Sequence, residues 1–374
     1  MKKNDPITIL IALLLIVAAI LYIQSTGLGA VVSPPGLNSV KNSIGNAINI
    51  TSNTSSVGEG ALFEKAPELM DIAGYINAPD NFTIASLKGK VVLVDFWTYS
   101  CINCIRTLPY LEAWDQKYRS MGLVIIGVQS PEFEFEKDYS NVFMAVQKYN
   151  ISYPVVLDND HATWDAYQNL YWPHDYLIDA NGYIRYDHIG EGDYDTTEGE
   201  IQQLLMERNG NNSVGSIVAS NISANYDLSR VGTPEIYLGY AFERQPIGNP
   251  QGFVPDTTVN YSLPASMQPN VVYFSGSWLN NPDNMELASD TGKIVLNYNA
   301  RNVNIVAGGN GTLGILLDNA APAQDQYGLD TSNGSVIVDQ QRLYSLIDDT
   351  GYNQRTIEID VTGKGFRIYT FTFG

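Results

Sequence analysis

Apolar residues in the middle of the chain switch between continuous runs and helical spacing. Residues 91–97 form an apolar, β-branched run broken only by Asp95, and residues 123–128 form a second such run. Runs of this kind are typical of buried central strands in a parallel sheet. Between them, the apolar side chains of residues 105–118 recur at helical spacing. The pattern therefore predicts a strand that leads almost directly into a helix, followed by a neighbouring strand.

The pattern farther along the chain predicts the rest of an α/β domain. A helix fits residues 139–149, a strand 153–157, a short helical stretch 164–170 and a closing helix 201–206. The segment 176–186 carries Asn181-Gly182 between two apolar runs, which is a signal for a two-residue hairpin turn. The pattern therefore predicts alternating strands and helices, followed by a hairpin and a closing helix.

The last third of the chain shows alternation instead of helical periodicity. Apolar residues occupy every second position at 294–298, 303–305, 357–361 and 366–368, and turn sequences lie between these segments. This spacing predicts an antiparallel β-sandwich.

The first residues of the chain predict a membrane anchor. Lys2 and Lys3 precede an apolar run from Ile7 to Ile23 that only Thr8 interrupts. The length of this run is at the short end of a membrane span and is long for the core of a signal peptide. The lysines would face the cytoplasm, and the rest of the chain would lie outside the cell membrane. A signal peptide cleaved near Ala30 is the alternative.

Composition divides the chain into parts. Small polar residues fill 24–60 and 209–230, which we interpret as a flexible stalk and a linker. The expected organisation is an anchor at 1–23, a stalk at 24–60, an α/β domain at 61–208, a linker at 209–230 and a β-sandwich module at 231–374. The formal net charge of −19 argues against nucleic acid and anionic membrane surfaces as partners, and its simplest consequence is solubility.

The chain contains two cysteines, Cys101 and Cys104, at the expected junction of the first strand and the helix. A disulfide between them would close too small a loop to stabilise a chain of 374 residues appreciably. A closed zinc site would need four ligands, and the only histidines that could complete one are His161, His174 and His188. A redox-active dithiol, which needs no further cofactor, is therefore favoured over both alternatives.

The expected position of Cys101 near a helix N-terminus suits redox chemistry. The partial positive charge of the unsatisfied amide groups there favours a thiolate, which is the nucleophilic form of cysteine. Cys104 could share that charge through its S–H group, and Ser100 is a candidate for the helix cap.

Several spaced motifs agree with one another. Asp95-Phe96-Trp97, Cys101-x-x-Cys104 and Pro109 resemble the pattern of the thioredoxin superfamily. The segments 89–97, 97–106, 130–133 and 171–179 resemble the TlpA/ResA branch and, most closely, the soluble part of the DipZ family of cytochrome c biogenesis proteins. The segments 233–239, 342–344 and 369–374 resemble the C-terminal module of that family. The resemblance implies a thioredoxin-like α/β domain followed by an all-β jelly-roll sandwich similar to carbohydrate-binding modules.

The resemblance also implies roles for individual residues. Pro173 would follow a cis peptide bond and face the reactive sulfur, with Trp172 and Trp97 as substrate-docking residues beside it. Asp95 would be a buried acid beneath the dithiol that accepts the proton of Cys104. The alternative is an acid at the strand end that is exposed to water.

Two further residues could tune the dithiol. Glu132, together with Glu134 and Glu136, lies in the region where related ResA-type proteins place a second acid, but a solvated acidic face is the simpler interpretation. His174 lies directly beside the proline.

These features predict a thiol–disulfide oxidoreductase anchored in the cell membrane. Cys101 would attack a disulfide in an extracytoplasmic partner, and Cys104 would release the reduced product. Ile102-Asn103 lacks the histidine of strongly oxidising pairs, which favours a reductant, and the resemblance points to apocytochrome c as a substrate. DipZ proteins carry a multi-span electron-conducting domain, whereas this chain has one apolar span. We therefore expect a separate CcdA-like membrane protein to donate the electrons.

The alternative function is an envelope or glycan-binding protein whose redox domain is secondary or vestigial. Tyr273 and Trp278 in the β-sandwich module could stack on sugar rings. Aromatic residues in a sandwich more often pack in its core.

Overall fold

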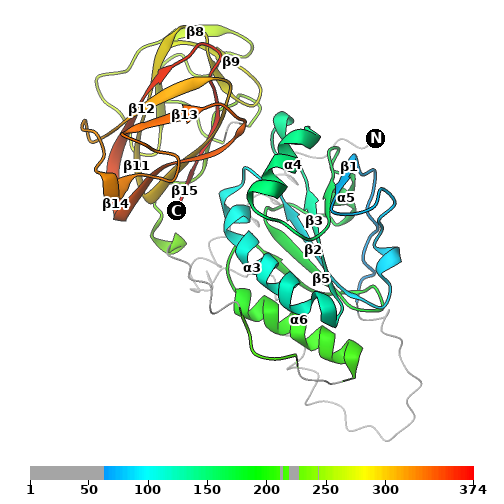
Figure 1. The fold of residues 1–374 in the computed structure, drawn as a ribbon. Coiled ribbons are helices and arrows are strands. Elements are labelled where there is room, and N and C mark those ends of the chain that lie inside the picture. The colour runs from blue at the N-terminus through cyan, green and yellow to red at the C-terminus, as the bar shows by residue number, and fades with distance from the viewer. Residues whose placement is uncertain (1–62, 211–213, 219–226, 243) are drawn as a thin grey trace, which may run out of the picture. The chain divides into compact units, whose positions relative to one another are not determined.

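The computed structural model describes residues 63–210, 214–218, 227–242 and 244–374 (Figure 1). The predicted anchor at 1–23 and the predicted stalk at 24–60 lie outside these residues. Within the described ranges, no helix is long and apolar enough to cross a membrane.

A mixed sheet of six strands forms the centre of the first domain. Its strands are β1 (Gly74–Ile76), β2 (Val91–Trp97), β3 (Leu123–Gln129), β4 (Val155–Leu157), β5 (His174–Ile178) and β6 (Ile184–Ile189). Their order across the sheet is β1-β4-β3-β2-β5-β6. β2, β3 and β4 run parallel, whereas β5 is antiparallel to β2 and β6 is antiparallel to β5. The continuous apolar run predicted as a central strand is β2, and every residue in it is buried.

Four α-helices pack on this sheet (Figure 1). They are α3 (Ile102–Tyr118), α4 (Tyr139–Lys148), α5 (Ala162–Ala166) and α6 (Tyr194–Asn209). The described residues also form 3-10 helices at Ala85–Leu87, Arg119–Met121, Glu134–Lys137, Leu228–Arg230 and Gln324–Gln326. α3 starts directly after Cys101, so the predicted strand-to-helix junction is present.

The closing helix α6 starts seven residues before the predicted stretch 201–206. Its first half buries Glu198, whose carboxylate accepts hydrogen bonds from the indole Nε1 of Trp114 at 3.2 Å and from Nζ of Lys117 at 3.3 Å. Because a polar side chain occupies the inward face here, the apolar periodicity that predicts a helix is missing.

Alternate residues of β2 pack against opposite faces of the sheet. Val94 and Phe96 point to one face, where Phe96 contacts the rings of Trp164 and Tyr167 at centroid distances of 5.8 and 5.3 Å. Trp97 points to the other face, which carries α3 and α6. The two-residue period places Asp95 on the same face as Trp97, and therefore on the side of the cysteine-bearing helix.

The C-terminal region is β-rich, as predicted. Its strands are β7 (Ile236–Tyr237), β8 (Thr258–Tyr261), β9 (Val272–Asn280), β10 (Met285–Leu287), β11 (Thr291–Gly308), β12 (Gly311–Leu317), β13 (Ser335–Val338), β14 (Arg342–Thr362) and β15 (Arg367–Phe373). The pairings between these strands are antiparallel. β11 and β14 pair along most of their length; the first half of β11 also pairs with β9 and its second half with β15. This long pair of strands therefore joins the two halves of the strand assembly.

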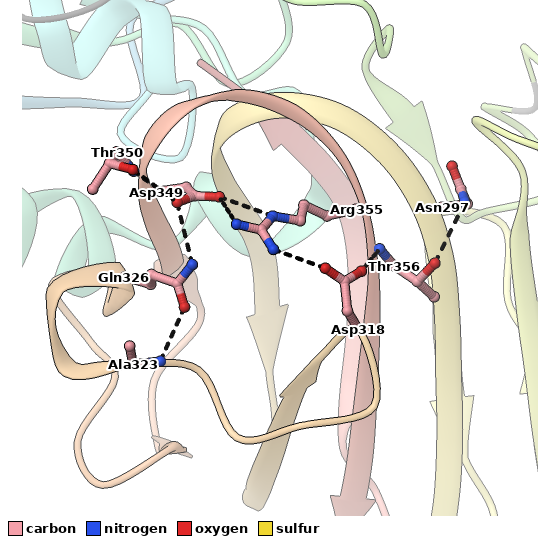
Figure 2. A network of polar contacts seen from close by, with 8 residues as sticks. All are labelled: Asn297, Asp318, Ala323, Gln326, Asp349, Thr350, Arg355 and Thr356. Carbon is pink, nitrogen blue, oxygen red and sulfur yellow. Dashed lines mark hydrogen bonds and ion pairs between the residues drawn. The ribbon is translucent and has the colours of Figure 1, made fainter.

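A polar network fastens the loop after β12 to β14 (Figure 2). The guanidinium of Arg355 donates to the buried carboxylate of Asp349 through Nε at 3.1 Å, and Nη2 lies 3.0 Å from the same carboxylate. Arg355 also donates to Asp318 at 2.8 Å, and Gln326 donates to Asp349 at 3.2 Å. Because each of these groups satisfies another, the network holds the loop without leaving the Asp349 charge unpaired.

Candidate active site

The two cysteines occupy different environments at the start of α3. Cys101 is the N-cap residue of α3, and its Sγ accepts a hydrogen bond from the backbone N–H of Cys104 at 3.2 Å. Cys101 is half-buried, whereas Cys104 is only 1% exposed. The first amide groups of a helix lack partners inside the helix, so a sulfur at the cap position satisfies one of them. Cys101 is therefore the sulfur that a partner protein can reach.

Ser100 does not cap the helix, contrary to the sequence-based expectation. Its hydroxyl instead donates to the carboxylate of Glu136, which is fully buried. The same carboxylate accepts the backbone N–H groups of Glu132 at 2.5 Å and Phe133 at 3.0 Å. Glu136 thus joins the loop after β3 to the loop that carries the cysteines. The prediction of a solvated acidic face is wrong for this residue.

The remaining acidic residues of that loop differ from Glu136. Glu134 has an exposed side chain that lies 2.9 Å from Nζ of Lys137. Glu132 is half-buried and borders the same surface depression as Cys101 and Trp172. Among these three acids, Glu132 is therefore the one that lines this depression.

The environment of Cys104 favours its protonated form. Burial raises the pKa of the Cys104 thiol, and the sulfur of Cys101 and the charge of Asp95 raise it further. A thiol in this setting becomes a nucleophile only when a base removes its proton.

Asp95 is buried, with 1% exposure, and is not an acid exposed to water at the strand end. Neither of its carboxylate oxygens has a hydrogen-bond donor among the described residues. Burial raises the pKa of Asp95 well above its usual value, and the neighbouring carboxyl of Asp175 raises it further. Asp95 thus has the properties expected of a proton acceptor beneath the dithiol.

Asp175 is a second buried acid that the sequence-based interpretation missed. It is the direct register partner of Asp95 across the β2–β5 pair, and its side chain is also buried. Burial raises its pKa as well. The signal available in the sequence was an acidic residue within an otherwise apolar strand, but only the strand pairing places it opposite Asp95.

The Trp172–Pro173 peptide bond is cis, which is the geometry that the family resemblance implied. The carbonyl of Pro173 accepts the N–H of Gly190 at 2.9 Å. In the described part of the chain, neither the N–H nor the C=O of Trp172 has a hydrogen-bond partner. The indole of Trp172 is held in place, because its Nε1 donates to the carbonyl of Ser130 at 3.0 Å and its ring lies 4.2 Å from that of Trp164.

Trp97 is not a substrate-docking residue. Its side chain has no exposed surface, so it cannot contact a partner protein. A β-carbon on Gly127 would lie 2.8 Å from its indole Nε1, which shows how closely β3 packs against it. Its aromatic ring instead belongs to the core beneath the cysteines.

His174 braces the segment before the proline. Its Nδ1 contacts Oδ1 of Asn169 at 2.6 Å, and its Nε2 contacts Oδ2 of Asp187 at 3.2 Å. Asn169 in turn accepts the N–H of Leu170 at 2.9 Å. His174 therefore positions the cis-proline loop. Within the described ranges, no group of three His, Cys, Asp or Glu side chains is placed to hold a metal ion.

The two aromatic residues considered for sugar stacking lie in the core of the C-terminal region. Trp278 has no exposed surface and Tyr273 is 3% exposed. The indole of Trp278 packs on Phe274 at a centroid distance of 4.9 Å. A sugar ring could therefore not stack on either side chain, and both have the core packing that is the more common role of aromatic residues in a sandwich.

Two protein-family models match the chain. Residues 65–187 match the AhpC/TSA family, and residues 233–374 match the thioredoxin-like C-terminal domain family. The first match covers the sheet, the cysteine pair and the cis-proline. Together with the geometry of this site, it identifies this part of the chain as a thioredoxin-like domain.

Similarity to individual proteins assigns the chain to a narrower family. Protein DipZ of Mycobacterium tuberculosis is 37% identical over 311 residues, which is 83% of this chain and 43% of DipZ. Thiol-disulfide oxidoreductase ResA of Bacillus cereus is 30% identical over 32% of this chain and 67% of ResA, and YkuV of Bacillus subtilis is 29% identical over 39% of this chain and 97% of YkuV. The chain belongs to the TlpA/ResA/DipZ-like family, and it spans less than half the length of DipZ.

Proposed function

We propose that this protein is a membrane-anchored, extracytoplasmic reductase of partner disulfides. The observation that carries the proposal is the hydrogen bond from the N–H of Cys104 to Sγ of Cys101 at 3.2 Å, on a sulfur that is accessible while Cys104 is buried. A donor aimed at the reachable sulfur stabilises its thiolate, so one cysteine is prepared for attack and the other is held in reserve.

The proposed reaction has two exchange steps. The Cys101 thiolate attacks one sulfur of the partner disulfide, which forms a mixed disulfide and releases the other partner sulfur as a thiolate. Cys104 then loses its proton and attacks Sγ of Cys101, which releases the second partner sulfur. Two electrons pass to the partner, and the Cys101–Cys104 pair is left as a disulfide.

The environment of Cys104 supports reduction as the direction. Burial raises the pKa of the Cys104 thiol, so this cysteine contributes no thiolate that would stabilise the reduced form of the pair. Strong oxidants such as DsbA work in the opposite way, because their reduced form is stabilised. The residues between the cysteines, Ile102 and Asn103, add no positive charge.

The backbone of Trp172 supports a docking mode for the partner. Its N–H and C=O have no hydrogen-bond partner among the described residues, and they lie beside the cis-proline in the depression that Cys101 also borders. An extended segment of the partner could pair with them as an added strand. Leu170 and Tyr171, which are 73% and 48% exposed, extend this surface with apolar contact area.

The source of electrons is a second part of the proposal. After each turnover the disulfide must be reduced again, and the chain contains no cysteine besides Cys101 and Cys104. We propose a CcdA-like membrane protein as the donor and apocytochrome c as one substrate, because the chain belongs to the TlpA/ResA/DipZ-like family. The apolar run Ile7–Ile23 would keep the reductase next to such a donor.

The redox potential of the pair tests the direction. Equilibration with glutathione buffers, followed by mass spectrometry of alkylated thiols, should give a value near the −270 mV or so of thioredoxin. A value near the roughly −120 mV of DsbA would contradict the reductase and favour an oxidase. Insulin reduction should accompany the low potential and should be lost in Cys101→Ser, with Ser216→Ala as a matched surface control.

A further inference from the structure

Three titratable residues lie in register across the sheet beneath the dithiol. Asp95 of β2 pairs directly with Asp175 of β5, and Asp175 pairs directly with His188 of β6. On the opposite side of Asp95, the register partner is Gly127 of β3, which has no side chain. Direct partners in antiparallel strands have Cα atoms about 4.5–5.5 Å apart and side chains on the same face. The three side chains therefore form one row from the centre of the sheet to its β6 edge.

The polar atoms of this row are buried without ordinary partners. In the described residues, both carboxylate oxygens of Asp95, Oδ1 of Asp175 and Nε2 of His188 have no hydrogen-bond partner. Buried polar atoms in native proteins are nearly always satisfied, so an unpaired set in one row needs an explanation. Two carboxyl groups side by side satisfy each other when they share one proton, because one then donates and the other accepts.

We propose that Asp175 shares a proton with Asp95, and that His188 connects this carboxyl pair to solvent at the sheet edge, so that the row relays the proton of Cys104. Asp175 and His188 act through Asp95 and do not touch the sulfur atoms. The relay rests on the exchange chemistry of the family, and it does not depend on whether the pair reduces or oxidises its partners.

The proton balance of the second exchange step defines the roles. When Cys104 attacks Sγ of Cys101, its proton moves to the ionised oxygen of the carboxyl pair, which then holds two protons. One of these protons passes to His188 and from its partly exposed ring to water, while the released partner thiolate takes up a proton from solvent. The pair returns to its singly protonated form. No oxidant or reductant is needed beyond the disulfide that is exchanged.

The surroundings suit this direction of transfer. Burial lowers the pKa of His188, so its ring is neutral and able to accept a proton at neutral pH. Other titratable groups around the row are Cys104 on α3, Tyr153 before β4 and Tyr186 on β6. Burial raises the pKa of both tyrosines, so they remain uncharged and leave the carboxyl pair as the proton acceptor.

The charges near His188 come from Asp187 and Asp193 and from His174. The two carboxylates would stabilise a proton on His188 for the time it spends there, whereas a protonated His174 would oppose it. The ring of His174 packs on that of Tyr176 at a centroid distance of 4.1 Å, and it therefore lies on the other face of the sheet.

The resolving step can be followed without a natural substrate. Ellman's reagent forms a mixed disulfide with Cys101, and the second thionitrobenzoate is released when Cys104 attacks, so its release rate reports the proton transfer. In Asp175→Asn of the full chain, Asp95 loses its like-charged neighbour and becomes a weaker base. We expect the acidic limb of the pH–rate profile to move to lower pH and the plateau to fall by about tenfold, less than the loss of a whole general base would cost.

A separate variant tests the role of His188 in passing the proton to solvent. His188→Gln should lower the plateau rate several-fold with the acidic limb in place, and imidazole in the buffer should restore part of the rate. Asp179→Asn is the matched control, because Asp179 is a buried acid just after β5 that pairs with Arg185 and not with Asp95. An unchanged pH–rate profile in Asp175→Asn would overturn the proposal that the two carboxyl groups share a proton. A wild-type plateau rate in His188→Gln would overturn the proposal that His188 passes the proton to solvent.

Carbon-13 NMR of the aspartate carboxyl groups gives a readout that does not require exchange activity. In the reduced full chain, the signals of Asp95 and Asp175 should titrate together in two coupled steps. In Asp175→Asn, Asp95 should titrate in one step at lower pH. Independent single-step titrations of both residues in the unsubstituted protein would overturn the proposal even if the protein reduces disulfides well.

Discussion

Replacing Asp95 by Asn should make the stability of the redox domain less sensitive to pH. Asp95 is buried without a hydrogen-bond donor among the described residues, and burial raises its pKa, with Asp175 adding to the effect. The folded state therefore keeps a proton that the unfolded chain releases above about pH 4. The stabilisation that comes from this retained proton is fully present below that pH, and it is lost as the pH rises through the pKa of Asp95 in the folded state. Asn carries no such proton, so the variant should lack the part of this loss that Asp95 causes, whereas Asp175, whose pKa burial also raises, keeps its own part.

The size of the effect follows from linkage. Each proton that the folded state retains costs about 1.4 kcal/mol of unfolding free energy for every pH unit of increase. Between about pH 5.5 and pH 7.5, the wild type should lose up to about 2.7 kcal/mol more than Asp95→Asn, and less if the carboxyl pair releases its proton within that range. A buried amide without a partner costs about 1–3 kcal/mol, but this cost is the same at every pH. The difference between the two pH slopes is therefore the quantity to compare.

Hydrogen exchange measured by mass spectrometry reports this slope for β2 and β3 within the full chain. Peptides that cover residues 91–97 and 123–129 should give opening free energies once their exchange rates are corrected for the intrinsic pH dependence. Peptides from β11 provide an internal control, because that strand belongs to the C-terminal region. Parallel pH dependences for wild type and Asp95→Asn would refute the argument that Asp95 is buried with its proton.

Three further substitutions test the packing around the site and in the C-terminal region. Gly127→Ala places a β-carbon 2.8 Å from Nε1 of Trp97, so it should destabilise the redox domain by about 1–3 kcal/mol in denaturant unfolding. Glu136→Ala removes the acceptor for Ser100 and for two backbone N–H groups, which should lower the free energy of unfolding by about 2–4 kcal/mol. It should also speed hydrogen exchange at residues 130–136. Glu134 is an exposed neighbour, so the control Glu134→Ala should change little. Arg355→Met leaves the buried Asp349 carboxylate without its main partner and should cost about 3–5 kcal/mol, whereas loss of the more exposed Asp318 should cost about 1 kcal/mol or less.

The junction that carries the cysteines could be predicted from the sequence because its signals are local. The apolar run 91–97 is a central strand with every residue buried, and the helical spacing after Cys104 corresponds to α3. Both elements are long and strongly patterned. The identity of the cap is not local information: Cys101 caps the helix, while Ser100 donates to Glu136, a residue that lies 36 positions away.

The parts that could not be predicted depend on strand pairing and on buried polar groups. Asp175 and His188 look like ordinary strand residues until the register places them beside Asp95. The first half of α6 lacks apolar periodicity because the buried position 198 is a glutamate. The motif suggests Trp97 as a docking residue, and only the packing beneath the cysteines shows that its side chain is inaccessible.

Capture of the mixed disulfide tests the central claim most directly. Cys101 is accessible and accepts the N–H of Cys104, so it is the proposed attacking sulfur. The buried Cys104 is proposed to release the reduced partner. A Cys104→Ser variant incubated with a disulfide-bonded protein such as insulin should therefore accumulate a covalent adduct through Cys101 that dithiothreitol dissolves, whereas Cys101→Ser should form none. Equal adduct formation through Cys104 in Cys101→Ser, or no adduct in Cys104→Ser, would contradict the proposed division of roles.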